Sequence, residues 1–283
     1  MRRAVVCALA LLLAACAGVR GPESPGDVPP VPDVPASDPV GLVGLWRVSG
    51  AEGAGERTWL RLAHGSYQLW PQDECRGFAA GGWRASARVF VASAPFAANG
   101  DCSLDPWPDG DGWLTSARAY RPTGDGWELL DADGAVVARL AVDGAPEPID
   151  TAVPEYAQPP EVTDDLRAAF AEPAPLPEGM RPAEAADLVG RWVRPGWGTR
   201  SAYVELAADG TYEGSDGCNA SGGAWGVDED GRLLATSGIS TAIGCDGAPV
   251  PTWLATAARA GFDGRTLVLL DADGEEIARL VRA

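Results

Sequence analysis

The stretch LLDADGEEIARL (269–280) decides the fold, because the chain carries nearly the same stretch twice. The other copy is LLDADGAVVARL (129–140), and the two differ only at the three residues that follow Asp-Ala-Asp-Gly. Each copy is typical of a strand, a tight turn ending in Gly, and a second strand. A hairpin that recurs at this spacing indicates two copies of one small β domain.

Further matches extend the repeat outward from this hairpin. LVGLW (42–46) corresponds to LVGRW (188–192), and the Trp-Leu pair at 113–114 corresponds to the pair at 253–254. The offset between the copies falls from 146 residues (42 to 188) to 140 residues (129 to 269). Such a drift is expected when loops change length while strands keep theirs. We therefore predict domains at 41–142 and 187–283.

The N-terminal residues have the pattern of a secretion signal. Arg2 and Arg3 precede an apolar run shorter than the roughly 20 residues that span a bilayer. The run ends in Leu-Ala-Ala-Cys (13–16), which resembles the bacterial lipobox. That resemblance implies removal of residues 1–15 and diacylation of Cys16, and two acyl chains at about 0.8 kcal/mol per buried CH₂ hold a protein to a membrane. The alternative is an ordinary cleaved signal in which Cys16 is incidental.

This pattern predicts an extracytoplasmic protein, lipid-anchored to the outer face of the cell membrane, or to the outer membrane where the organism has one. The formal net charge of −18 argues against nucleic acid as a partner. Residues 16–40 are rich in Pro and form an expected tether after the anchor. A second Pro-, Ala- and Glu-rich linker covers 143–186, and its segment 161–172 has an apolar face suited to a short docked helix.

Four further cysteines lie within the repeat, two in each copy. Cys75 and Cys102 are 27 residues apart, and so are Cys218 and Cys245. In an oxidising compartment this predicts one disulfide inside each copy, each contributing roughly 3 to 4 kcal/mol on the chain-entropy model. A metal site lacks ligands, because the only histidine is His64 and no Cys-x-x-Cys occurs. No metal and no cofactor are expected.

The second copy reads as a series of short strands joined by tight turns. Strand patterns cover 201–207, 211–213, 224–227, 232–236, 266–270 and 276–281. Residues 249–260 lack alternation and begin with Pro, which predicts a helix. We therefore expect a mainly β chain with two tandem antiparallel half-barrels, each with one short helix.

A set of residues in the second copy resembles the signature of the META/HslJ-like domain. The residues are Gly217, Cys218, Asn219, Gly223, Trp225, Thr241 and Cys245. The resemblance covers roughly 188–281 and implies a small lipocalin-like open barrel with a helix, found in bacterial envelopes and linked to stress or drug tolerance. It supplies no catalytic residues. In the first copy Arg76 stands in the place of Asn219, so we interpret that copy as a diverged member.

Several candidate sites have structural alternatives. The two Asp-Ala-Asp-Gly segments begin like calcium loops, but position 12 holds Val142 or Arg282, so hairpin turns are favoured. Asn219 is favoured as a residue that fixes a loop. Tryptophans that recur in both copies are expected in the core. Trp107, in a loop with no equivalent, is the candidate ligand contact.

These observations favour a non-enzymatic envelope lipoprotein that binds a small ligand or an envelope protein. A Ser–His–Asp or Cys–His arrangement would depend on His64, which the second copy lacks, and no phosphate loop or dinucleotide motif occurs. The alternative is a glycan-directed hydrolase with two facing carboxylates about 5 to 9.5 Å apart in a cleft. The oligomeric state is left open by the sequence.

Overall fold

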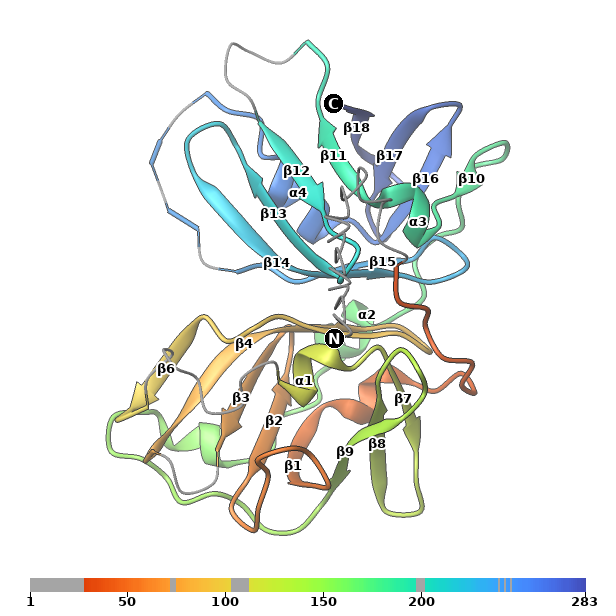
Figure 1. The fold of residues 1–283 in the computed structure, drawn as a ribbon. Coiled ribbons are helices and arrows are strands. Elements are labelled where there is room, and N and C mark those ends of the chain that lie inside the picture. Colours follow the sequence, from red (N-terminus) through yellow and green to blue (C-terminus); the bar gives the residue numbers. More distant parts are fainter. Residues whose placement is uncertain are drawn as a thin grey trace, which may run out of the picture.

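The computed structural model forms two β-rich domains, one stacked on the other (Figure 1). It describes residues 28–71, 75–102, 112–196, 202–238, 240–241, 243–244 and 246–283. Cys16, Trp107 and Cys245 lie outside the described residues. Within the described part of the chain, no helix combines the length and apolarity needed to cross a membrane.

The N-terminal domain is an antiparallel sheet that curls on itself. Its elements are η1 (Pro39–Leu42), β1 (Gly44–Ser49), β2 (Trp59–Ala63), β3 (Ser66–Trp70), β4 (Gly77–Ala85), β5 (Phe90–Ala92), β6 (Ala97–Gly100), α1 (Trp113–Ser116), β7 (Ala119–Pro122), β8 (Gly126–Leu130) and β9 (Val136–Ala141). The strand order is β5-β4-β3-β2-β1-β9-β8-β7, with β6 paired to β4. A bridge between Val89 and Ala119 brings the two ends of the sheet together, so the sheet closes toward a barrel.

The C-terminal domain repeats this topology. Its elements are β10 (Arg181–Pro182), α3 (Ala185–Leu188), β11 (Gly190–Val193), β12 (Tyr203–Leu206), β13 (Thr211–Ser215), β14 (Ala220–Val227), β15 (Leu233–Ala235), α4 (Val250–Thr256), β16 (Arg259–Asp263), β17 (Thr266–Leu270) and β18 (Glu276–Arg282). The order β16-β17-β18-β11-β12-β13-β14-β15 matches the first domain strand for strand, and β10 adds to β16. A bridge between Arg232 and Arg259 joins the sheet ends. The prediction of two tandem antiparallel half-barrels is confirmed.

Matched tryptophans lie at equivalent places in the two cores. The Trp46 indole donates to the carbonyl of Leu42 at 2.8 Å, and the Trp192 indole donates to Leu188 at 2.6 Å. Both rings are buried, and burial of roughly 200 Å² at about 25 cal/mol per Å² contributes about 5 kcal/mol each. The short helical turns η1 and α3, which the sequence analysis did not anticipate, present these carbonyls.

The predicted helix at 249–260 is too long. The structure ends α4 at Thr256, and Ala257 is extended. Arg259 begins β16, where it pairs with Leu270, and the amide of Ala258 donates to the carbonyl of Leu270 at 2.8 Å. Helix propensity therefore gives way to hairpin pairing, which satisfies the backbone of 258–263 with a buried neighbour strand.

The linker between the domains docks on both of them. Its helix α2 (Asp164–Ala169) begins at Thr163, whose hydroxyl accepts from the amide of Leu166 at 3.2 Å. Leu166 is buried in the N-terminal core, and the ring of Phe170 lies 5.6 Å from that of Trp83. The expected docked helix in 161–172 is therefore present, shorter than its predicted segment.

An earlier part of the linker covers the outer face of the N-terminal sheet. Trp59, Trp70 and Phe78 form a small cluster there, against which Tyr156 packs. The rings of Phe78 and Tyr156 meet edge to face at 5.3 Å. Trp59 and Trp70, which have no counterpart in the second copy, are therefore buried structural residues and not exposed binding aromatics.

The two domains meet through equivalent strands. β14 packs against β5, and β15 packs against β4 (Figure 1). Val91 lies in an apolar cluster with Ala224 and Leu234. The backbones approach closely, since a Cβ added at Gly226 would stand 2.8 Å from Val91 Cγ1, and one at Gly82 would stand 2.9 Å from the Cβ of Thr236. Larger side chains at these two positions would force the domains apart.

Candidate functional site

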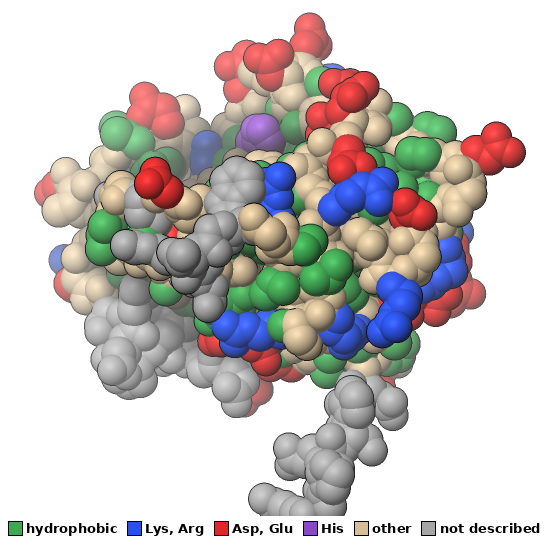
Figure 2. Space-filling model, turned by 90° about the horizontal axis from the view of Figure 1, so that it is seen from above, with side chains coloured by type: hydrophobic (Ala, Val, Ile, Leu, Met, Phe, Trp, Pro, Cys, Tyr) green, Lys and Arg blue, Asp and Glu red, His purple; other side chains and the backbone are tan. Residues whose placement is uncertain are grey.

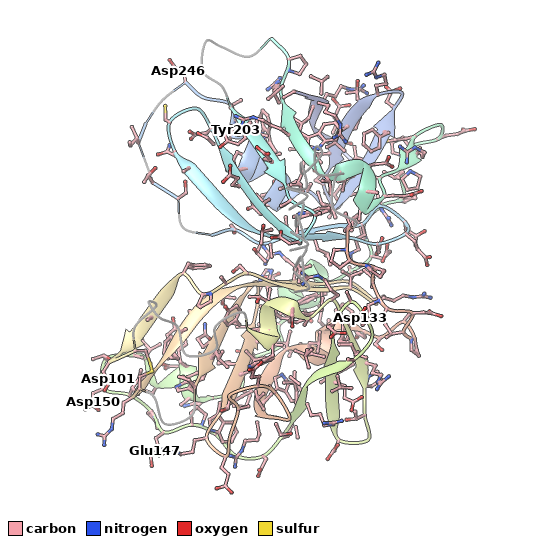
Figure 3. The ribbon with its side chains drawn as sticks, in the orientation of Figure 1. Asp101, Asp133, Glu147, Asp150, Tyr203 and Asp246 are labelled. Atoms are coloured by element: carbon pink, nitrogen blue, oxygen red, sulfur yellow. A yellow bond between two sulfur atoms is a disulfide. The ribbon has the colours of Figure 1, made fainter. Side chains whose placement is uncertain are left out.

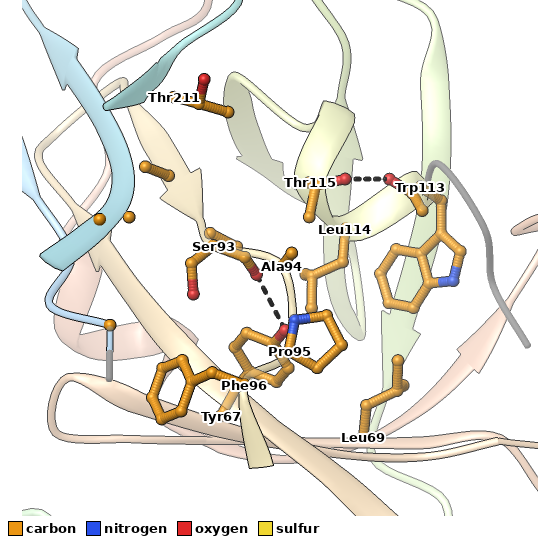
Figure 4. Close-up of a pocket in the computed structure, with 16 residues that line it drawn as sticks. Tyr67, Leu69, Ser93, Ala94, Pro95, Phe96, Trp113, Leu114, Thr115 and Thr211 are labelled. Atoms are coloured by element: carbon orange, nitrogen blue, oxygen red, sulfur yellow. Dashed lines mark hydrogen bonds between the residues drawn. The ribbon is translucent and has the colours of Figure 1, made fainter. Parts of the chain in front are cut away.

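A cavity of about 520 Å³ lies between the domains, at the mouth of the N-terminal half-barrel (Figure 4). We call it the interdomain pocket. It is lined by Tyr67, Leu69, Ala92, Ser93, Ala94, Pro95, Phe96, Gly112, Trp113, Leu114, Thr115, Thr211, Gly222, Gly223, Ala224 and Gly238. Barrel mouths and domain interfaces are the usual positions of small-molecule sites, and this volume lies in the usual range of about 300 to 1,000 Å³.

The N-terminal domain supplies the inner part of the interdomain pocket. Tyr67 and Leu69 project from β3 into the barrel, and both are buried in its core cluster. The Tyr67 hydroxyl donates to the carbonyl of Ser93 at 2.9 Å (Figure 4). The Ser93 hydroxyl accepts from the amide of Gly82 at 3.0 Å. These bonds fix the segment after β5, whose residues form one wall.

The C-terminal domain supplies a wall made largely of glycine. Gly222 and Gly223 lie on β14, and the amide of Gly238 donates to the carbonyl of Gly222 at 2.9 Å. A Cβ at Gly223 would stand 2.6 Å from the Thr236 hydroxyl oxygen, so only glycine fits there. Gly223, one of the signature residues, thus permits close packing beside the pocket.

The polar framework behind this wall repeats that of the first domain. The Tyr212 hydroxyl donates to the carbonyl of Thr236 at 2.6 Å, and the Thr236 hydroxyl accepts from the amide of Ala224 at 2.8 Å. Tyr67 and Ser93 make the same pair of bonds in the other copy. Burial raises the pKa of Tyr212 to about 12, so its hydroxyl stays protonated.

The interdomain pocket is uncharged. Among the described residues that line it, none is acidic or basic. Two hydroxyl groups of the lining donate to acceptors of the protein itself: Thr115 donates to the carbonyl of Gly112 at 2.9 Å, and Thr211 donates to the Asp209 carboxylate at 2.6 Å. Apolar groups, including Phe96, make up most of the remaining lining.

Charged residues are instead distributed over the outer surface. Figure 2 shows a face on which acidic and arginine side chains are interspersed with apolar ones. In Figure 3 the labelled carboxylates of Asp101, Glu147 and Asp246 lie at the edges of the two domains. Near the pocket, Arg118 bridges the domains, because its guanidinium donates to the carbonyl of Asp209 at 2.7 Å. Burial lowers the pKa of Arg118.

Asn219 is fully engaged in fixing a loop. Its amide nitrogen donates to the Asp216 carboxylate at 2.8 Å and to the carbonyl of Ile243 at 2.9 Å. Its amide oxygen accepts from the Thr241 hydroxyl at 2.8 Å and from the amide of Ile243 at 2.7 Å. Signature residues Asn219 and Thr241 therefore join two loops, and Asn219 has no role in the interdomain pocket.

The Asp216 carboxylate stabilises this loop by accepting hydrogen bonds from it. Burial opposes its ionisation, but hydrogen bonds from the Asn219 side chain and from the amides of Asn219 and Cys218 outweigh that effect and lower its pKa. The carboxylate accepts from these amides at 2.6 and 2.8 Å. The Gly-Cys-Asn segment is thus a backbone-binding turn built around a charged acceptor.

The cysteines form cross-links. Cys75 and Cys102 are joined by a disulfide, with Cα atoms 5.0 Å apart. Cys218 is also disulfide-bonded, while Cys245, its predicted partner, lies outside the described residues. Asp101 lies beside the first disulfide, but sulfurs already bonded to each other are not thiolate ligands for a metal.

The two Asp-Ala-Asp-Gly segments are hairpin turns. The Asp131 carboxylate accepts from the amides of Asp133 and Ala135 at 3.0 and 2.9 Å. Asp271 makes the same two bonds in the other copy. The carboxylates of Asp131 and Asp271 therefore accept hydrogen bonds from the backbone of the turn, as the hairpin interpretation predicts.

Comparison with known proteins identifies one family. The family model of the META domain matches residues 184–283, which cover the C-terminal domain from α3 to β18. No curated protein and no solved structure matches the chain.

Proposed function

We propose that this chain, with a META domain at residues 184–283, is a lipid-anchored envelope protein that binds a small molecule in the interdomain pocket without catalysing a reaction. The N-terminal domain, in this proposal, is a diverged copy of the same domain. Its identical strand order supports that relationship. The lipobox-like sequence before Cys16 supports the anchor and the extracytoplasmic location.

One observation carries the proposal of ligand binding: the cavity of about 520 Å³ is lined by both domains. A cavity of this size at a domain interface is typical of a small-molecule site. Here the buried Tyr67 hydroxyl and the Ser93 carbonyl form a fixed wall around open space. Among the described residues that line that space there is no carboxylate, so we favour a binding function there over hydrolysis by paired acids.

Native mass spectrometry tests the proposal. The acyl-free protein would be incubated with an organic extract of cell envelopes, re-purified and examined for retained small molecules. Ala94 is an exposed residue on the rim of the pocket, so Ala94→Trp fills the pocket with little effect on the core. Ala97 is also exposed and is not part of the lining, so Ala97→Trp is the matched control.

We expect a retained molecule in the wild type and in Ala97→Trp, and its loss in Ala94→Trp. Absence of any adduct from all three proteins contradicts ligand binding, and so does an adduct that persists in Ala94→Trp. The anchor is tested separately by fractionation of cells that produce full-length Cys16→Ser. The variant is expected to leave the membrane fraction, and membrane retention equal to wild type would refute lipidation at Cys16.

A further inference from the structure

The chemistry of the pocket lining also points to the class of molecule that fits it. Resting on the proposed function, we infer that the interdomain pocket selects an uncharged, largely apolar molecule that contains an aromatic or similarly flat ring, and that it rejects anions of the same shape. The inference concerns this cavity only and follows from three features of its lining.

The first feature is the absence of compensating charge. None of the lining residues that the structure describes is charged at neutral pH, and the chain as a whole carries a formal net charge of −18. An anion in the pocket would lose its hydration without gaining a cationic partner, which is strongly unfavourable. Arg118 does not offset this, because its guanidinium already donates to the carbonyls of Thr115, Ala117 and Asp209 at 2.7, 3.0 and 2.7 Å.

The second feature is the direction of the hydroxyl protons. Those of Tyr67, Thr115 and Thr211 point to acceptors of the protein, at 2.9, 2.9 and 2.6 Å respectively. Anion sites in proteins need several donors that converge on the ligand. These three hydroxyls instead donate to acceptors in the walls of the pocket. They are therefore not available as donors to a ligand, and the pocket discriminates against a ligand that needs donors.

The third feature is the shape of the apolar surface. Phe96 and Trp113 bring aromatic side chains to the N-terminal side, with Leu114 between them in Figure 4. The opposite side is formed by backbone of Gly222 and Gly223, which present no side chain. A smooth glycine wall facing aromatic groups accommodates a flat ring, which gains from stacking and from loss of hydrated apolar area.

The helix of the C-terminal domain packs closely on its own sheet. There α4 packs down on β13, so that Pro251 Cγ would stand only 2.9 Å from a Cβ at Gly214. Val250 and Leu254 of the same helix are buried in the core. Apolar side chains of α4 are thus packed into the C-terminal core, and among the described residues this domain gives the pocket only Thr211 of β13, three residues of β14 and Gly238.

A pair of fluorescent probes tests this inference. N-phenyl-1-naphthylamine and 8-anilinonaphthalene-1-sulfonate share one aromatic skeleton, and the second adds a sulfonate. Both would be titrated into the acyl-free two-domain protein, into Ala94→Trp, and into the control Ala97→Trp. Thr211→Trp, which fills the pocket from the C-terminal side, repeats the test in case Ala94→Trp does not fold, and circular dichroism monitors folding of all variants.

We expect the neutral probe to bind the wild type and Ala97→Trp at least tenfold more tightly than the anionic probe. A pocket-filling variant should weaken binding of the neutral probe at least tenfold. Equal binding of both probes, with both lost in the filled variants, would overturn the selectivity and leave the proposed function standing. Neutral-probe binding that is absent or unaffected by filling would overturn the inference, and the envelope-extract experiment then decides separately whether the pocket binds anything.

Discussion

The linker residue Glu172 forms ion pairs with two arginines of the C-terminal domain, and its removal tests how much these contacts between linker and domain stabilise the protein. Its carboxylate accepts from Arg232 at 3.0 Å and from Arg259 at 2.5 Å. These arginines lie on either side of the bridge that closes the C-terminal barrel. Both guanidinium side chains are buried, at 8% and 7% exposure, whereas Glu172 is 62% exposed. Glu172→Ala would leave two buried cations without a carboxylate.

The size of the effect follows from these exposures. A hydrogen bond to a charged group contributes about 1.5 to 3 kcal/mol when buried, whereas an exposed ion pair contributes about 0.2 to 1 kcal/mol. With one partner buried and the other solvated, about 1 kcal/mol for each bond is appropriate. The carbonyls of Ala174 and Asp230, each at 2.8 Å from Arg259, limit the loss further. We expect Glu172→Ala to destabilise the protein by about 2 kcal/mol.

Differential scanning fluorimetry measures this change. For a protein of this size, about 2 kcal/mol corresponds to a fall in Tm of roughly 4 to 8 °C. Glu178 is an exposed linker carboxylate for which the structure gives no ion pair, so Glu178→Ala is the control and should leave Tm within about 1 °C. Equal Tm values for the two variants would refute a stabilising role of the Glu172 ion pairs.

Two further predictions concern the loops around the signature residues. Asn219→Ala leaves the Thr241 hydroxyl and the Ile243 amide without their acceptor, and we expect a loss of about 2 to 3 kcal/mol as a lower urea midpoint; an unchanged midpoint would mean that these bonds contribute nothing net. The lowered pKa of Asp216 means that its stabilisation is fully present above the ordinary carboxyl pKa of about 3.9 and is lost as pH falls through the folded-state value. The gap between the urea midpoints of wild type and Asp216→Asn should therefore narrow from pH 6 to pH 3, and a constant gap would contradict the assignment.

Much of the fold could be predicted from the sequence, because the determinants are local and occur twice. The strand expected at 266–270 is β17 with the same limits, and the turn at 271–274 follows directly. The prediction of a helix at 249–260 was wrong at its C-terminal end, since α4 ends at Thr256. There the backbone pairs with a strand that comes later in the chain, and local propensity does not report such a partner.

The candidate site could not be predicted in the same way. The interdomain pocket exists only where two domains dock, so none of its dimensions is encoded in a local pattern. The tyrosines of its hydroxyl framework can be recognised in the sequence, since Gly-Ser-Tyr (65–67) and Gly-Thr-Tyr (210–212) occupy matching positions after a turn. Pairing each tyrosine with Ser93 or Thr236, however, requires knowledge of contacts 26 and 24 residues away.

The two domains pack against each other in a nearly twofold arrangement. β14 meets β5 and β15 meets β4, which is the pattern of an isologous dimer interface built within one chain. The symmetry breaks where Trp83 and Trp225 are followed by different residues. Gly226 admits Val91, while Arg84 turns back to donate to the carbonyl of its neighbour at 3.1 Å.

Two identical copies packed in this way would carry two equivalent spaces, one on each side of the interface. In the C-terminal domain, which the META family model matches, Pro251 of α4 packs closely on β13 at Gly214. The N-terminal domain supplies most of the described lining of the interdomain pocket, from Tyr67 to Thr115. If the N-terminal domain is a diverged copy, as we propose, then the domain that departs from the family signature is also the one that forms most of the pocket.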